Sequence, residues 1–142
     1  MSSFAMPTVG DSVEFSGKLG SSDERLTYTL TSYDPAKEIY NRHKVEVTDN
    51  QIPQNSDESV RAATLPAEAD IELLLSNCMP PVGQIETVTV PAGTFKACKM
   101  RQGDQGDSWV WTAKVPFGTV KVDTLIGKTR LQLELQKFTL GR

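Results

Sequence analysis

The sequence predicts a mainly β (α+β) protein: a curved antiparallel sheet or half-barrel of about eight strands, with one amphipathic helix packed on it. Segments in which apolar and polar residues alternate recur along the chain between turn residues, which is typical of antiparallel strands. Residues 66–78 instead repeat their apolar side chains at helical spacing. A chain of 142 residues is expected to form one domain, 1–142, with a single core.

The N-terminal half predicts a three-stranded meander. Residues 1–10 have no periodicity and are expected to form a loose lead-in. Strands are expected at residues 12–19, 25–33 and 38–48, the second because Leu26, Tyr28 and Leu30 alternate with threonines. Residues 49–64 are rich in Asn, Gln, Ser and Asp, and we expect an irregular exposed loop there.

Residues 66–78 predict the helix. Pro66 suits a first helical turn, where the missing N–H costs nothing, and the acidic residues that follow complement the positive end of the helix dipole. Pro80 and Pro81 prevent the helix from continuing. One apolar stripe is expected to face the sheet, formed by Ala67, Ile71, Leu74, Leu75 and Cys78.

The C-terminal half predicts a run of β-hairpins. Pro91-Ala92-Gly93-Thr94 and Pro116-Phe117-Gly118 are turn sequences, and the alternation of the last strand shifts phase at Lys137, which predicts a bulge or the end of the sheet. Such a long sheet has to curl, or split into a sandwich, to protect its edges. The expected strands are 84–90, 95–102, 108–115, 119–125 and 131–140.

The two cysteines favour a disulfide. Cys78 ends the predicted helix and Cys98 lies in the outgoing strand of the next hairpin, so the fold is expected to bring them together. The bond would close a loop of about 21 residues and stabilise the protein by about 3 kcal/mol. A disulfide would indicate an oxidising compartment. Two buried free thiols are the alternative, and a reactive cysteine or a metal pair is a more distant one.

Composition and motifs exclude several function classes. A net charge of −3 with scattered basic residues argues against nucleic-acid binding, and no apolar run is long enough to span a bilayer. We expect no catalytic residues, no metal site and no cofactor. His43 is the one histidine and lies mid-strand, the cysteines and His43 do not make a zinc set, and residues 103–107 lack calcium-loop spacing. Glu134 or Glu86 could face another acid across a strand, but their pattern is that of a polar sheet face.

The start of the sequence bears on localisation. Residues 1–10 lack the basic and apolar segments of a signal peptide, which taken alone indicates the cytosol. Because of the expected disulfide we instead expect a periplasmic or extracellular protein whose signal sequence is absent from these 142 residues.

A resemblance to a group of proteins rests on the C-terminal half. The hairpin Val90-Pro91-Ala92-Gly93-Thr94-Phe95 is followed by Trp109 and Trp111, by Pro116-Phe117-Gly118 and by the alternating residues 131–135. Over residues 78–140 this pattern resembles uncharacterised bacterial exported and envelope proteins, including lipoproteins, many classed as domains of unknown function. More remotely it is similar to lipoprotein-localisation carriers, which hold acyl chains beneath a helix. This chain is shorter and lacks an arginine placed like their ligand switch, so that similarity implies the fold alone.

The leading hypothesis is a non-catalytic exported domain that binds an apolar ligand or acyl chain between sheet and helix. Its partners would be a lipid or another envelope protein. Trp109 and Trp111 share one strand face and are expected to belong to the core, to a pocket wall or to an interface. The alternatives are a structural or protein-interaction module with a solid core, and a carboxylate-based hydrolase. The candidate pocket residues are Ile71, Leu74, Leu75, Trp109, Trp111 and Phe117.

Overall fold

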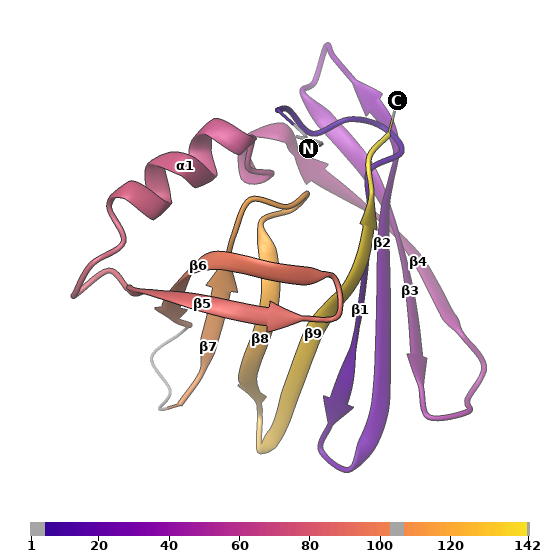
Figure 1. Ribbon diagram of the computed structural model, residues 1–142. Coiled ribbons are helices and arrows are strands. Elements are labelled where there is room, and N and C mark those ends of the chain that lie inside the picture. The colour runs from indigo at the N-terminus through magenta and orange to yellow at the C-terminus, as the bar shows by residue number, and fades with distance from the viewer. Residues whose placement is uncertain (1–4, 103–106, 142) are drawn as a thin grey trace.

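The computed structural model describes residues 5–102 and 107–141 and contains one antiparallel sheet. Helix α1 (Glu68–Ser76) and a short 3-10 helix, η1 (Ala62–Thr64), connect its two halves. The strands are β1 (Ser12–Leu19), β2 (Ser22–Asp34), β3 (Ile39–Thr48), β4 (Gln54–Arg61), β5 (Gln84–Val90), β6 (Gly93–Arg101), β7 (Trp109–Thr112), β8 (Thr119–Ile126) and β9 (Thr129–Thr139). Their order is β4-β3-β2-β1-β9-β8-β7-β6-β5 (Figure 1). The mainly β prediction with one helix is confirmed.

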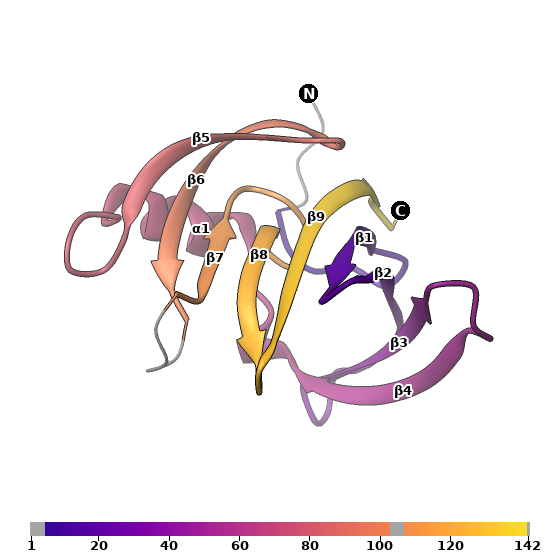
Figure 2. The same ribbon diagram turned by 90° about the horizontal axis from the view of Figure 1, so that it is seen from below.

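Two meanders make up this sheet. Strands β1 to β4 pair in sequence order, as do β5 to β9, and β1 pairs with β9 to join the two sets. Edge strands β4 and β5 therefore lie at opposite ends of an open, curled sheet (Figure 2). At one end the β5–β6 hairpin runs across the other strands, and the N–H of Ala92 in its turn donates to the carbonyl of Leu135 at 3.1 Å.

Strand β4 corrects two predictions, the count of about eight strands and the irregular loop at 49–64. Residues 54–61 pair with β3 along their whole length, and η1 follows directly. The strand was missed because it lies at the sheet edge with most of its side chains exposed on both faces, so it lacks the apolar alternation of a half-buried strand. Glu58 and Val60 are half-buried, and Val60 packs against Leu30, Tyr40 and Leu65.

Helix α1 is shorter than the predicted 66–78. Its first turn is held by the carboxylate of Asp70, which accepts the Ala67 N–H at 2.9 Å, and by the Glu68 N–H, which donates to the carbonyl of Ala5 at 2.8 Å. The apolar stripe is partly confirmed: Ala67, Ile71 and Cys78 are buried, but Leu74 and Leu75 are half-buried. Leu73, outside the stripe, is 65% exposed.

The core lies between the curled parts of the sheet. It is one large cluster to which both meanders contribute, with a smaller one around Leu30, Tyr40 and Leu65. The large cluster consists of Val13, Phe15, Leu26, Val88, Val90, Ala97, Trp111, Ala113, Val115, Val120, Leu133 and Leu135.

The predicted phase shift in the last strand is confirmed as a bulge between β1 and β9. Glu14 pairs with Lys137, whereas Phe15 pairs with Leu135, so Gln136 is the extra residue. The described part of the lead-in, residues 5–10, forms no strand, but hydrogen bonds tie it to the fold. The Tyr40 hydroxyl donates to the carbonyl of Pro7 at 2.7 Å, and the Gly10 N–H donates to that of Leu30 at 2.8 Å.

Candidate functional site

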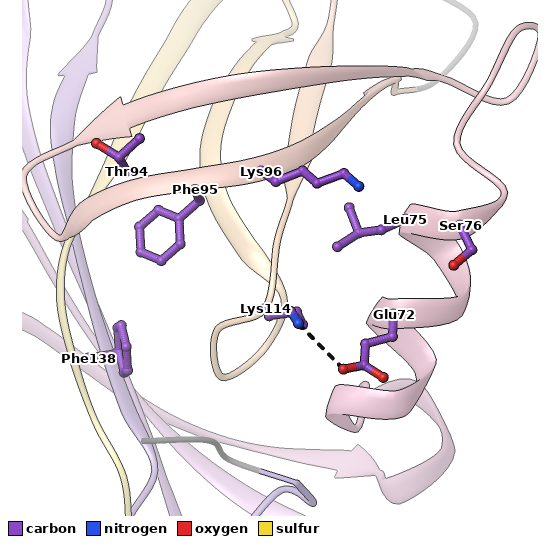
Figure 3. Close-up of a pocket in the computed structure, with 8 residues that line it drawn as sticks. All are labelled: Glu72, Leu75, Ser76, Thr94, Phe95, Lys96, Lys114 and Phe138. Atoms are coloured by element: carbon purple, nitrogen blue, oxygen red, sulfur yellow. Dashed lines mark hydrogen bonds and ion pairs between the residues drawn. The ribbon is translucent and has the colours of Figure 1, made fainter. Parts of the chain in front are cut away.

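An open cleft lies between α1 and the sheet, with a volume of about 730 Å³. This volume lies within the range of ligand-binding pockets. Figure 3 shows Phe95 and Phe138 on one side, and Leu75 with Glu72 on the helix side. The lining residues are Glu72, Leu75, Ser76, Thr94, Phe95, Lys96, Lys114 and Phe138.

Helix α1, strands β6 and β9 and the β7–β8 turn, which carries Lys114, supply this cleft. The second half of α1 contributes Leu75, β6 contributes Phe95 and Lys96 just after its turn, and β9 contributes Phe138 beyond the bulge. Because the bulge shifts the alternation by one residue, Phe138 pairs with the buried Val13 of β1. The apolar wall of the cleft thus depends on the bulge.

The charged residues that line the cleft are Glu72, Lys96 and Lys114. Lys114 Nζ lies 3.4 Å from Oε1 of Glu72, an exposed ion pair at the helix side of the cleft (Figure 3). In residues 5–102 and 107–141, no acidic side chain lies within ion-pair distance of Lys96. The cleft therefore combines an apolar wall with an ammonium group, that of Lys96, which forms no ion pair with the carboxylates of the described residues.

The pocket residues predicted from sequence do not all lie in one cavity. Leu75 lines the cleft. Ile71 is 2% exposed and packs over the turn after β7, where a Cβ at Gly118 would lie 3.6 Å from its Cδ1. Leu74 is half-buried on the same helix, and Trp109 and Trp111 are not among the cleft residues. The other cleft residues escaped prediction because nothing in the periodicity of β6 or β9 says which strand approaches the helix.

Phe117 belongs to a second, smaller hollow on the sheet. It has a volume of about 280 Å³ and is lined mainly by apolar residues of β1, β2, β8 and β9. The guanidinium of Arg42 lies 4.6 Å from the ring centre of Tyr28 and 6.0 Å from that of Phe117. Arg42 is also paired with Glu58 of β4, Nη2 to Oε1 at 2.6 Å. These contacts tie the polar edge strand to the core.

The tryptophans are surrounded by charged side chains of neighbouring strands. Trp111 is 6% exposed and belongs to the core cluster, and its indole N–H donates to Oε1 of Glu86 at 2.9 Å. Lys99 Nζ lies 4.5 Å from the ring centre of Trp109 and 5.4 Å from that of Trp111. Lys121 lies 4.9 Å from the Trp111 ring centre. The protein's own cations therefore already contact both rings.

The predicted disulfide is confirmed. Cys78 and Cys98 are bonded, with their Cα atoms 5.9 Å apart, and both are buried. The bond attaches the chain just after α1 to β6, the strand that also supplies Phe95 and Lys96. It therefore helps to hold the two walls of the cleft together.

Glu24 and His43 are two of the groups whose pKa values are perturbed. Burial raises the pKa of the Glu24 carboxyl, and a hydrogen bond with Glu46 raises it further. His43 lies on β3 with Nδ1 2.9 Å from Oδ1 of Asp57 and Nε2 3.0 Å from Oδ1 of Asn55, and these contacts raise the pKa of its imidazole.

In the part of the chain that the structure describes, no three His, Cys, Asp or Glu side chains form a group that could hold a metal ion. Most of the polar loop considered for calcium, residues 103–106, lies outside the described residues.

Comparisons with known proteins give information on the fold alone. No family model and no curated protein matches the chain. The crystal structure of an inferred exported protein from Bacteroides fragilis, described as having a YmcC-like fold, matches with a TM-score of 0.52 and 14% sequence identity. The match covers 97% of this chain and 100% of that one. This chain therefore has a fold close to the YmcC-like fold. In addition, no helix in the described residues has the length and apolar character needed to cross a membrane.

Proposed function

We propose that this chain is an exported, non-catalytic domain that binds an amphipathic ligand in the cleft beneath α1, an acyl chain with an anionic head group. The observation that carries the proposal is Lys96, an ammonium group without a carboxylate partner among the described residues, beside the apolar side chains of Leu75, Phe95 and Phe138. An acyl chain would lie against the apolar wall, and its head group would pair with Lys96.

Two observations support export. The Cys78–Cys98 disulfide is the form that cysteines take in an oxidising compartment. The Bacteroides fragilis protein that shares the fold is itself described as inferred to be exported. The resemblance of residues 78–140 to bacterial envelope proteins, based on the hairpin and turn motifs, is part of the same proposal and favours the periplasm or the cell exterior.

Binding can be tested with a matched pair of ligands, a fluorescent fatty acid and the corresponding fatty alcohol. Lys96→Gln should weaken binding of the acid about tenfold and leave the alcohol unchanged, because only the acid carries the charge that Lys96 pairs with. Leu75→Ser should weaken both, because it removes part of the apolar wall. Lys37→Gln, in the exposed β2–β3 turn, is the control.

Native mass spectrometry of the purified protein adds a test that needs no chosen ligand. A bound lipid that disappears in Leu75→Ser supports the proposal. If no lipid co-purifies and neither probe binds the wild type, the cleft is not an acyl-chain site.

A second candidate, a carboxylate-based hydrolase, is favoured by Glu24. Its raised pKa is what a general acid needs, and it lines an open hollow of about 560 Å³ together with Glu14, Asp23 and Asp49. Neither carboxylate considered from sequence lines this hollow: Glu86 accepts a hydrogen bond from Trp111, and Glu134 lies on β9. A hydrolytic activity that survives Glu24→Gln would remove Glu24 from this role.

A further inference from the structure

Residues 73–85, from the second half of α1 to the start of β5, form an uncharged and exposed apolar segment. All thirteen residues lack charge, in a chain of which 23% are charged. Four large apolar side chains in it face solvent: Leu73 at 65%, Met79 at 59%, Val82 at 52% and Ile85 at 37% exposure. The loop between α1 and β5 lies at one extremity of the molecule in both views (Figures 1 and 2).

Several backbone donors of this segment are absent or already bonded within it. Pro80 and Pro81 have no N–H, and the N–H groups of Val82 and Gly83 both donate to the carbonyl of Met79, at 2.8 and 3.1 Å. At the end of α1, the side-chain amide of Asn77 donates to the carbonyl of Leu73 at 2.9 Å. Because these donors are bonded within the segment, moving them to the head-group boundary of a bilayer does not leave them without a partner.

The segment is also held in place. Cys78 lies in its middle and is bonded to the fully buried Cys98, while Leu75 and Ser76 within it line the cleft. The exposed side chains therefore project from an anchored part of the fold at the cleft.

We propose that residues 73–85 dock on the surface of a lipid bilayer, with Leu73, Met79 and Val82 entering the apolar boundary below the head groups. Contacts with another protein are commonly made through aromatic residues, methionine and arginine, and of these the segment has only Met79. An electrostatic attachment to anionic lipids would need basic residues, which the segment also lacks, and the chain has a net charge of −3. Apolar insertion is the attraction that this composition supports.

Docking would place the cleft against a source of acyl chains, and this step rests on the proposed function. The docking itself does not, because it needs only the exposed side chains. The two proposals can therefore fail separately: fatty-acid binding is measured without vesicles, and docking is measured without a ligand.

The test is flotation of the full chain with vesicles of phosphatidylcholine alone, and with mixed vesicles of phosphatidylcholine and phosphatidylglycerol. We expect the wild type to bind both, with little dependence on salt. Leu73→Glu and Val82→Glu should each lower the partition coefficient about tenfold, because each puts a charge where an apolar side chain would be buried. Ile52→Glu is the matched control, an equally drastic change at a side chain that is 81% exposed in the β3–β4 loop.

Circular dichroism and an intact disulfide would show that the variants are folded, which is expected because the changed side chains are exposed. The proposal is overturned if the wild type does not float, if it floats only with the anionic vesicles and is released by salt, or if Leu73→Glu and Val82→Glu float like the wild type. A dimer that Val82→Glu dissociates, without flotation, would assign the segment to a second copy of the chain and also overturn it.

Discussion

Gly17 of β1 lies directly against the backbone of Gln132 in β9: a Cβ on Gly17 would lie 1.8 Å from the carbonyl oxygen of Gln132 and 3.0 Å from Cα of Leu133. This contact is part of the β1–β9 ladder that joins the two meanders. A side chain of any size at Gly17 would have to push the two strands apart.

Gly17→Ala is therefore expected to destabilise the protein by about 3 kcal/mol, at the upper end of overpacking costs, because the obstructing atoms are backbone. Urea unfolding followed by circular dichroism measures the change. Gly127→Ala is the comparison: Gly127 has a φ of +64° but open space around it, so it should cost only about 1 kcal/mol. Equal losses at the two positions would contradict the role assigned to the β1–β9 contact.

Reduction of the Cys78–Cys98 bond should lower the free energy of unfolding by about 3 kcal/mol, because the loop that it closes is then free in the unfolded chain. The intact mass of the purified protein should be two hydrogens below that of the reduced form. In the double variant Cys78→Ala/Cys98→Ala, a reducing agent should have no further effect. A wild type whose stability does not respond to reduction would show that the bond contributes nothing to stability.

The hydrogen bond from Trp111 to Glu86 offers a graded test of the buried indole. Glu86→Val should cost about 2 kcal/mol because it leaves the N–H of a residue that is 6% exposed without its partner. Glu86→Gln keeps an oxygen acceptor in place and should cost less than about 1 kcal/mol. If Glu86→Val is as stable as Glu86→Gln, the Trp111 N–H has another partner.

His43 should titrate above its ordinary pKa of 6.5, because Asp57 and Asn55 accept hydrogen bonds from the protonated ring. NMR can follow it without ambiguity, since it is the one histidine of the chain. Asp57→Asn should lower the pKa toward 6.5. Because the folded-state pKa is raised, protonated His43 stabilises the pairing of β3 with β4 fully below pH 6.5, and this contribution is lost as pH rises through the raised pKa.

The difference in unfolding free energy between wild type and Asp57→Asn should accordingly shrink as the pH rises. A difference that grows with pH would contradict the assignment of the ion pair.

Local sequence patterns predicted much of the fold. The alternation around Leu26, Tyr28 and Leu30 is confirmed as β2, and the phase shift at Lys137 as the bulge against β1. Both signals are local because a half-buried strand needs alternate side chains of opposite polarity, whatever strand lies beside it. Strand β4 has no such signal, because a solvated edge strand is specified by its hydrogen bonds to β3 rather than by its side chains.

The candidate site depended on contacts between distant residues. Leu75 was predicted from the helix stripe, and the position of Cys98 followed from the hairpin. Phe95, Lys96 and Phe138 could not be assigned to the cleft, because their place beside α1 depends on how far the sheet curls. Trp109 and Trp111 lie instead among Lys99, Lys121 and Glu86, since strand order decides which side chains meet across β6, β7 and β8.

Residue spacing along the chain indicated the strands with clear alternation, the helix α1 and the turns, and it favoured the pairing of the two cysteines, because each of these involves residues close together in the sequence. Residue spacing did not predict the edge strand β4, the pairing of β1 with β9 or the cleft. These depend on backbone hydrogen bonds and on close approaches, such as that of Gly17 to Gln132, between segments whose separation in sequence says nothing about their separation in space.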